Sequence, residues 1–249
     1  MTDIAATAAM LLAVRQGAPR LENLGAHAPG NEAEAWAVQQ EVLRLMGGRI
    51  GGYKCAAPPG KEPSGGIMAA AGVVPGPRPW KVPAGEQMGI ETEIAVRLGR
   101  DLPGRATPYT EAEVLDAVSE CFPVIELVSS RFQNMRAVTP LEALADGIAH
   151  AGLVYGAAVP DWRTRDLNAL TVRQSCGGVV QVEKVGGNPS GHAFVALLWL
   201  ANFLPSIGLH LRANQVVTTG SCTGLLFVEP KQRVTGGFLG FGEVSVDLV

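Results

Sequence analysis

Hydrophobic residues recur at helical spacing in two segments at the start of the chain, over residues 4–16 and 31–46. The second segment begins at Asn31, a favourable N-cap residue, carries acidic residues in its first turn, and stops at Gly47-Gly48. These patterns predict two N-terminal helices.

The pattern changes to short β-branched runs further along the chain, interrupted by three more helical segments. Thr110 followed by Glu113 has the spacing of a capping box, which marks the start of one of these helices. The Pro/Gly-rich passage 58–87 predicts a boundary between an N-terminal part and the main domain. We therefore expect an α+β fold with a β-rich core, divided into an N-terminal α/β portion over 1–85 and a β-rich domain over 86–249. Predicted strands cover 49–56, 89–98, 123–128, 152–158, 179–184, 215–219, 224–228 and 242–248, and predicted helices cover 110–120, 139–147 and 191–208.

Composition narrows the class of protein. The 249 residues are 47% hydrophobic and 17% charged, which is typical of a globular domain, and 31 Gly and 17 Pro indicate many turns. A formal net charge of −3 without a Lys/Arg cluster argues against nucleic-acid binding. The acidic N-terminus lacks the basic start of a signal peptide, and the longest apolar run of the second half, "HAFVALLWLANFL", is too short to span a bilayer. Four scattered cysteines suit a reducing compartment, so we expect a soluble cytoplasmic protein with no membrane association.

Three glutamates suggest a metal site. Glu91 and Glu93 lie two apart in a predicted strand, so both side chains point to one side of it. An acidic pair of this kind is also common on a solvated strand face. Glu126 lies in an apolar run, where a carboxylate needs a compensating charge; Arg131 could supply it locally. Alternatively, Glu126 faces the other two glutamates, and three carboxylates together favour a hard divalent cation, Mg²⁺ or Mn²⁺.

Two further segments have the residue types of a binding site. Lys54, within "IGGYKCAA", has apolar neighbours, and a partly buried lysine can bind a carboxylate or move a proton. A lysine extending from a strand end to solvent would have the same surroundings. The turn Thr219-Gly220-Ser221 can offer N–H groups and hydroxyls to a substrate oxygen, although such turns also occur as ordinary strand ends.

The order of "GYK", "IETEIAVRLGRDLPG", "ELVSSRF", "ALLWLAN" and "VVTTGS" resembles the 2-keto-4-pentenoate hydratase family, with its sister 4-oxalocrotonate decarboxylases, in the fumarylacetoacetate hydrolase superfamily. The resemblance covers nearly the whole chain. It implies a mixed β-roll, a homo-oligomer, and one Mg²⁺ or Mn²⁺ held by Glu91, Glu93 and Glu126. It also implies that Lys54 is the basic catalytic group and that the turn Thr219-Gly220-Ser221 holds the oxygens of a 2-oxo acid.

The expected activity is that of a metal-dependent lyase in the catabolism of aromatic compounds. Hydration of 2-hydroxypenta-2,4-dienoate to 4-hydroxy-2-oxopentanoate is the first expectation, and decarboxylation of a 4-oxalocrotonate-type acid is the second. Arg131 either orients Glu126 or binds a substrate carboxylate. A C–C hydrolase would need a His–Glu pair, for which His27 with Glu32 or Glu34 is the early candidate.

Three departures from the family pattern surround the expected substrate region. Ala71 stands in the best alignment for a family aspartate, "CAAPPG" replaces a "GLTS"-like stretch, and His150 takes the place of a small polar residue. These departures leave open an altered substrate, or a weakly catalytic or non-catalytic partner subunit of a hydratase or decarboxylase.

Overall fold

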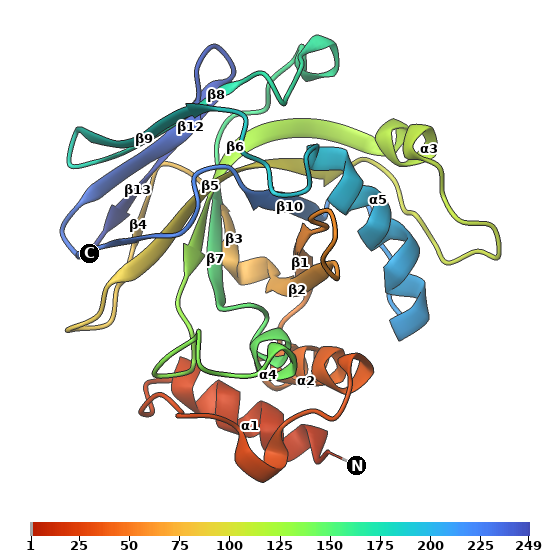
Figure 1. Ribbon diagram of the computed structural model, residues 1–249, viewed down its shortest axis with the longest axis vertical. Helices are drawn as coiled ribbons and strands as arrows, with labels where there is room; N and C mark the ends of the chain where they lie inside the picture. Colours follow the sequence, from red (N-terminus) through yellow and green to blue (C-terminus); the bar gives the residue numbers. More distant parts are fainter. Residues whose placement is uncertain (1) are drawn as a thin grey trace.

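The computed structural model describes residues 2–249, and its N-terminal helices form a layer at one end of the molecule (Figure 1). Helices α1 (Ile4–Arg15) and α2 (Glu32–Leu45) contact each other, and α4 (Pro140–Ala145) packs on α2. Asp3 and Asn31 cap the first two helices by accepting hydrogen bonds from backbone N–H groups. Both predicted N-terminal helices are confirmed.

Most of the remaining chain forms two β-sheets. The larger has eight strands in the order β2-β1-β10-β5-β6-β7-β3, with β11 also paired to β5. The smaller has five strands in the order β4-β13-β12-β8-β9. The larger sheet contains β1 (Ile50–Ala56), β2 (Ser64–Ala69), β3 (Val73–Pro75), β5 (Met88–Leu98), β6 (Val118–Val128), β7 (His150–Tyr155), β10 (Val216–Ser221) and β11 (Leu226–Val228). The smaller contains β4 (Arg78–Trp80), β8 (Thr171–Cys176), β9 (Val179–Val185), β12 (Arg233–Phe238) and β13 (Gly242–Leu248).

The remaining helical segments lie between strands. Helix α5 contacts β1 and β10, and α3 contacts α5 and β6; both lie on the right of Figure 1. Their bounds, with those of the short 3-10 turns, are α3 (Glu111–Asp116), α5 (Ala193–Phe203), η1 (Gly25–His27), η2 (Ala70–Gly72), η3 (Trp162–Thr164) and η4 (Leu204–Ile207).

The two faces of the larger sheet have different surroundings. Ile90, Ile125 and Leu127 project from one face into an apolar cluster with Val234 and Val246 of the smaller sheet, and all five side chains are buried. Because side chains alternate along a strand, the neighbouring positions of β5 and β6 project from the opposite face. The packing of the two sheets against each other therefore determines which residues of β5 and β6 face away from the smaller sheet.

Strand pairing brings distant parts of the chain together on that opposite face. Strand β1 runs parallel to β10, with Lys54 beside Thr218. Strand β10 runs antiparallel to β5, and β5 runs antiparallel to β6, with Glu91 directly opposite Glu126. Segments separated by more than 160 residues thus become neighbours in one sheet.

The α+β prediction is confirmed, with three local errors. Strand β8 (Thr171–Cys176) lies outside every predicted element, because pairing with β9 and β12 orders a largely polar segment. The passage 58–87, for which no strand was predicted, contains strands β2, β3 and β4, because pairing with β1, β7 and β13 orders a sequence poor in β-branched residues. The helix predicted over 110–120 ends at Asp116, since residues from Val118 onward pair with β5. Strands before and after residue 85 share the larger sheet, and a domain division there stays a prediction. Within residues 2–249, every helix is too short or too polar to cross a membrane.

Candidate metal centre

Three glutamates meet on the face of the larger sheet that points away from the smaller one. Glu91 and Glu93 come from β5 and Glu126 from β6, and one carboxylate oxygen of each lies within 4.8 Å of the others. Glu93 and Glu126 are buried and Glu91 is half-buried. The cluster is therefore an interior feature, and the solvated strand face is excluded as an explanation of the acidic pair.

Glu126 has one satisfied and one unsatisfied oxygen. Its Oε1 lies 2.6 Å from Lys54 Nζ and 3.0 Å from His150 Nδ1. Its Oε2 is buried and has no hydrogen-bond partner among residues 2–249. A buried carboxylate oxygen without a partner costs free energy, so this atom indicates a missing ligand.

Strand β10 holds the second buried carboxylate. The Thr218 hydroxyl and the Gly220 N–H, at 2.8 Å, both donate to Glu93 Oε2. Gly220 has a φ of +110°, and a Cβ there would lie 2.6 Å from Pro189 Cγ. Only glycine fits this close approach, which explains the residue at the centre of the predicted turn.

The charges of the cluster do not balance. Burial, followed by repulsion from Glu126 and Glu91, raises the pKa of Glu93 to about 8. Burial also raises the pKa of Glu91, despite the attraction of Lys54. Burial opposes ionisation of Glu126, but Lys54 and His150 hold its pKa below the usual value. One lysine thus faces three carboxylates, and His150, whose pKa burial lowers, is neutral and donates to Glu126.

These residues fit a hard divalent cation. The donors are all carboxylate oxygens, one of them is unpartnered, and a dication would relieve the repulsion that raises the pKa values of Glu91 and Glu93. Among residues 2–249, the candidate ligand group holds three glutamates and no histidine or cysteine, which disfavours zinc.

A left-handed turn shapes the wall next to Glu126. Three successive residues, Gly147–Ala149, have φ values of +63°, +51° and +59°, and Ile148 is β-branched. This conformation is strained for a β-branched residue and persists only where surrounding contacts enforce it. It directs the Ile148 carbonyl to Lys54 Nζ at 3.2 Å and places His150 against Glu126.

Arg131 supplies those enforcing contacts. It forms a buried ion pair with Asp146 and donates to the carbonyl of Asp146 at 2.6 Å, as well as to those of Ser129 and His150. Ser130 also donates to the Asp146 carboxylate. All three guanidinium nitrogens therefore already bond to the protein around the turn.

The structure brings some of the predicted site residues into contact with the three glutamates and others not. Lys54 contacts Glu126, and the Gly220 N–H contacts Glu93. The Ser221 side chain lowers the pKa of Glu91, whereas the Thr219 hydroxyl donates to the Ile94 carbonyl.

Sequence reasoning missed two residues of the cluster. Thr218 directly precedes the predicted turn, and the pairing of β10 with β5 brings its hydroxyl to Glu93. His150 stood out as unusual in the sequence, but only the pairing of β6 with β7 brings it to Glu126.

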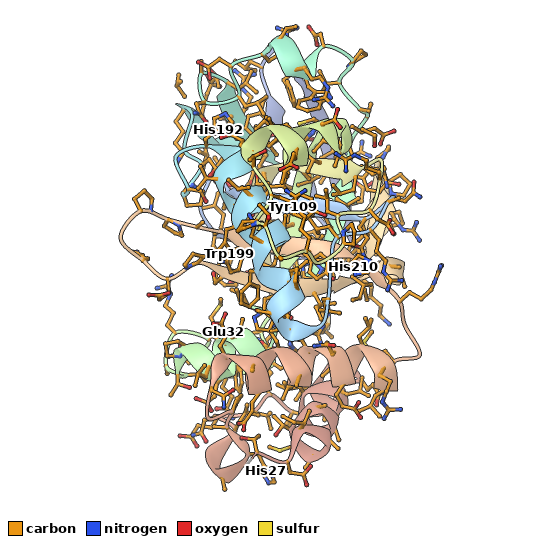
Figure 2. The ribbon with its side chains drawn as sticks, turned by 90° about the vertical axis from the view of Figure 1, so that its right-hand side faces the viewer. His27, Glu32, Tyr109, His192, Trp199 and His210 are labelled. Atoms are coloured by element: carbon orange, nitrogen blue, oxygen red, sulfur yellow. The ribbon has the colours of Figure 1, made fainter. Side chains whose placement is uncertain are left out.

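The candidate residues for a C–C hydrolase do not form a His–Glu pair. Glu34 accepts hydrogen bonds from Thr2 and from the Gly30 N–H, and Glu32 accepts one from a tryptophan of its own helix. Figure 2 shows His27 at the outer edge of the N-terminal helical layer, away from Glu32. No hydrogen bond or ion pair joins His27 to either glutamate within residues 2–249.

Comparison with known proteins gives a consistent picture. Residues 49–249 match the family described as fumarylacetoacetate (FAA) hydrolase, C-terminal. A 4-oxalocrotonate decarboxylase of Pseudomonas putida is 29% identical over 160 residues, which cover 64% of this chain and 60% of the relative. A 2-keto-4-pentenoate hydratase of Burkholderia vietnamiensis is 27% identical over 254 residues, covering 97% of this chain and 96% of the relative.

A solved structure supports the fold. A 4-oxalocrotonate decarboxylase from Pseudomonas putida G7, complexed with magnesium and adipate, superposes with a TM-score of 0.86 at 24% identity, covering 99% of this chain and 97% of that one. The predicted β-roll architecture is thereby confirmed. The chain spans about three fifths of the length of the first curated relatives it matches, with 60% and 58% for the first two.

Proposed function

Because this chain belongs to the fumarylacetoacetate hydrolase family, we propose that it is a metal-dependent lyase acting on a small 2-oxo or 2-hydroxydienoate acid. The observation that supports this best is the buried cluster of Glu91, Glu93 and Glu126, with its unpartnered Oε2 and adjacent lysine. Mg²⁺ is the proposed ion and Mn²⁺ the alternative.

The three glutamates would hold the cation. When bound, it would stabilise negative charge developing on the 2-oxo oxygen of the substrate. Glu93 is oriented for this role by Thr218 and the Gly220 N–H, and Glu126 by Lys54 and His150.

Lys54 is the proposed proton-transfer group. Burial disfavours its charged form, but Glu126 and Glu91 raise its pKa above the usual value, so Nζ holds a proton at neutral pH. This ammonium can hydrogen-bond a substrate oxygen and return a proton to carbon as an enol converts to its ketone. The Ile148 carbonyl and Glu126 fix its position.

Two reactions need the same residues. Hydration of 2-hydroxypenta-2,4-dienoate requires ketonisation and addition of water at C4. Decarboxylation of a 4-oxalocrotonate-type acid requires a group that accepts the electron pair left by CO₂. The curated relatives include both kinds of enzyme. We further propose that the protein is a cytoplasmic homo-oligomer and acts in the catabolism of aromatic compounds. In this proposal it has its own catalytic site and is not a partner subunit of another enzyme.

The remaining predicted residues receive proposed roles. Gly220 and Ser221 lie beside the glutamates and would help to hold the substrate oxygens, with the Thr219 side chain anchoring the turn through Ile94. Arg131, whose nitrogens all bond to the protein, is proposed to position the turn that supports Lys54 and His150.

The test is the decay of 2-hydroxypenta-2,4-dienoate absorbance in Mg²⁺ and in EDTA, with CO₂ release from 4-oxalocrotonate measured in parallel. Lys54→Met should reduce turnover about 100-fold or more and retain Mg²⁺ binding, because a proton-transfer group contributes about 10²–10⁴-fold. Lys61→Met, in an exposed loop of the same segment, is the matched control and should be fully active. A folded, Mg²⁺-binding protein inactive on both acids would contradict the proposal and favour the binding-subunit alternative.

A further inference from the structure

Glu126 is hydrogen-bonded through one of its two oxygens. Lys54 Nζ lies 2.6 Å and His150 Nδ1 lies 3.0 Å from Oε1, whereas Oε2 is buried and has no hydrogen-bond partner among residues 2–249. An ionised carboxylate has about four lone-pair sites, two on each oxygen, so the two donors occupy both sites of Oε1. An ion can therefore bind Glu126 through Oε2 alone.

Glu93 shows the same asymmetry. The Thr218 hydroxyl and the Gly220 N–H both donate to its Oε2. These two donors occupy one oxygen and leave Oε1 for an ion. Two of the three glutamates are thus arranged to bind an ion through a single oxygen each.

A β-bulge turns His150 toward Glu126. The register of β6 with β7 shifts between Leu127 and Val128, which adds one residue, Ala151, to β7. The residue of β7 that pairs with Glu126 lies three positions after His150. Because side chains alternate along a strand, an uninterrupted β7 would direct His150 to the opposite face of the sheet. Bulges of this kind redirect a side chain beside a functional site.

The backbone of His150 is held on both sides. Its carbonyl accepts hydrogen bonds from Arg131 at 3.1 Å and from Arg15 at 3.3 Å. Its N–H donates to the Gly147 carbonyl at 3.1 Å. These contacts fix the start of β7, so the imidazole holds the Glu126 carboxylate in one orientation.

We infer that His150 is a positioning residue for the cation, and that it and Thr218 make the centre select Mg²⁺ over Ca²⁺ by restricting Glu126 and Glu93 to one oxygen each. The inference rests on the proposed function and adds an ion preference to it. Mg²⁺ requires near-octahedral coordination, whereas Ca²⁺ takes about six to eight oxygens and often binds both oxygens of a carboxylate. A centre in which the second oxygens are already hydrogen-bonded denies Ca²⁺ these additional contacts.

The test is calorimetric titration with Mg²⁺ and with Ca²⁺, which gives the ratio of the Ca²⁺ Kd to the Mg²⁺ Kd. His150→Leu removes the donor to Glu126 and keeps an apolar side chain of similar size, and Thr218→Val removes the hydroxyl that donates to Glu93. Each should lower the ratio about 10-fold, the equivalent of one charge-assisted hydrogen bond. His150→Asn, which retains an N–H donor, should keep most of the selectivity.

The control is His27→Leu, which replaces an exposed histidine at the outer edge of the N-terminal helical layer (Figure 2) and should leave the ratio unchanged. Scanning calorimetry in EDTA identifies the variants that fold. A general structural defect would weaken the binding of both ions equally, so an unchanged ratio in either folded variant, His150→Leu or Thr218→Val, would overturn the inference.

Infrared difference spectra give a second measurement. The antisymmetric and symmetric carboxylate stretches lie further apart when a carboxylate binds an ion through one oxygen, so Ca²⁺-loaded His150→Leu should show a narrower separation than the unsubstituted protein. Since neither measurement needs turnover, retained selectivity in a protein inactive on both acids would refute the proposed lyase and support the positioning role of His150. A protein that binds neither ion would overturn both.

Discussion

Glu126→Gln tests the metal centre most directly, because it keeps the shape of a fully buried side chain and removes its charge. At an effective dielectric constant of about 20, two ionised carboxylates no more than 4.8 Å apart repel by at least about 3.5 kcal/mol, and the 2.6 Å Lys54–Glu126 pair attracts by about 6 kcal/mol. The substitution removes repulsion and attraction together, so the metal-free variant should lose only a few kcal/mol of stability.

The difference between variants should appear when Mg²⁺ is added. A ligand at 100 times its Kd stabilises a protein by about 2.7 kcal/mol, and in a chain of this size about 2–4 °C of Tm corresponds to each kcal/mol. With Mg²⁺ at about 100 times its Kd, scanning calorimetry should therefore give the unsubstituted protein a Tm about 5–11 °C higher than in EDTA.

In Glu126→Gln the Mg²⁺-dependent rise should vanish. Glu120→Gln is the matched control, since this residue lies on the same strand, is partly exposed, and pairs with Arg97 away from the cluster. A Mg²⁺-dependent rise of equal size in Glu126→Gln would refute the assignment of this residue as a ligand.

Three further substitutions test the surroundings of the cluster. Arg131→Met should cost about 3–5 kcal/mol in urea denaturation, because it leaves Asp146 buried without its partner; an effect on KM alone would instead indicate substrate binding. Gly220→Ala should weaken Mg²⁺ binding about 10- to 100-fold in calorimetric titration, because the added Cβ would meet Pro189 and displace the N–H group that donates to Glu93. An unchanged Mg²⁺ affinity would argue that this N–H group does not orient Glu93. Glu142→Ala should cost about 2–4 kcal/mol of unfolding free energy, because this buried residue caps α4 and accepts a second backbone hydrogen bond, while Mg²⁺ affinity stays the same.

Local patterns predicted the parts of the site that depend on one strand. The two-residue period places Glu91 and Glu93 on the same side, and burial of Glu126 followed from its apolar neighbours. Capping residues correctly located the starts of α2 and α3. Each of these features is determined within a few residues of sequence.

The features of the site that depend on strand register could not be predicted from local sequence patterns. Whether Glu126 faces Glu91 depends on an antiparallel register, in which a slip by one residue would turn the side chain to the other face. The contact between Lys54 and the cluster requires β1 to lie beside β10, far along the chain. Arg131 illustrates the same limit, because its partner Asp146 directly precedes the left-handed turn Gly147–Ala149, which no periodicity indicates.

The position of β10 in the larger sheet has a consequence for how the protein folds. This strand, Val216–Ser221, lies between β1 and β5, so the hairpin of β1 and β2 cannot join the rest of the sheet until β10 has been synthesised. Until then β1 and β5 each present an open edge during translation. Such non-local pairing gives slow folding and exposes the nascent chain to aggregation. The candidate metal centre, which uses residues of β1, β5, β6 and β10, therefore assembles among the last parts of the molecule.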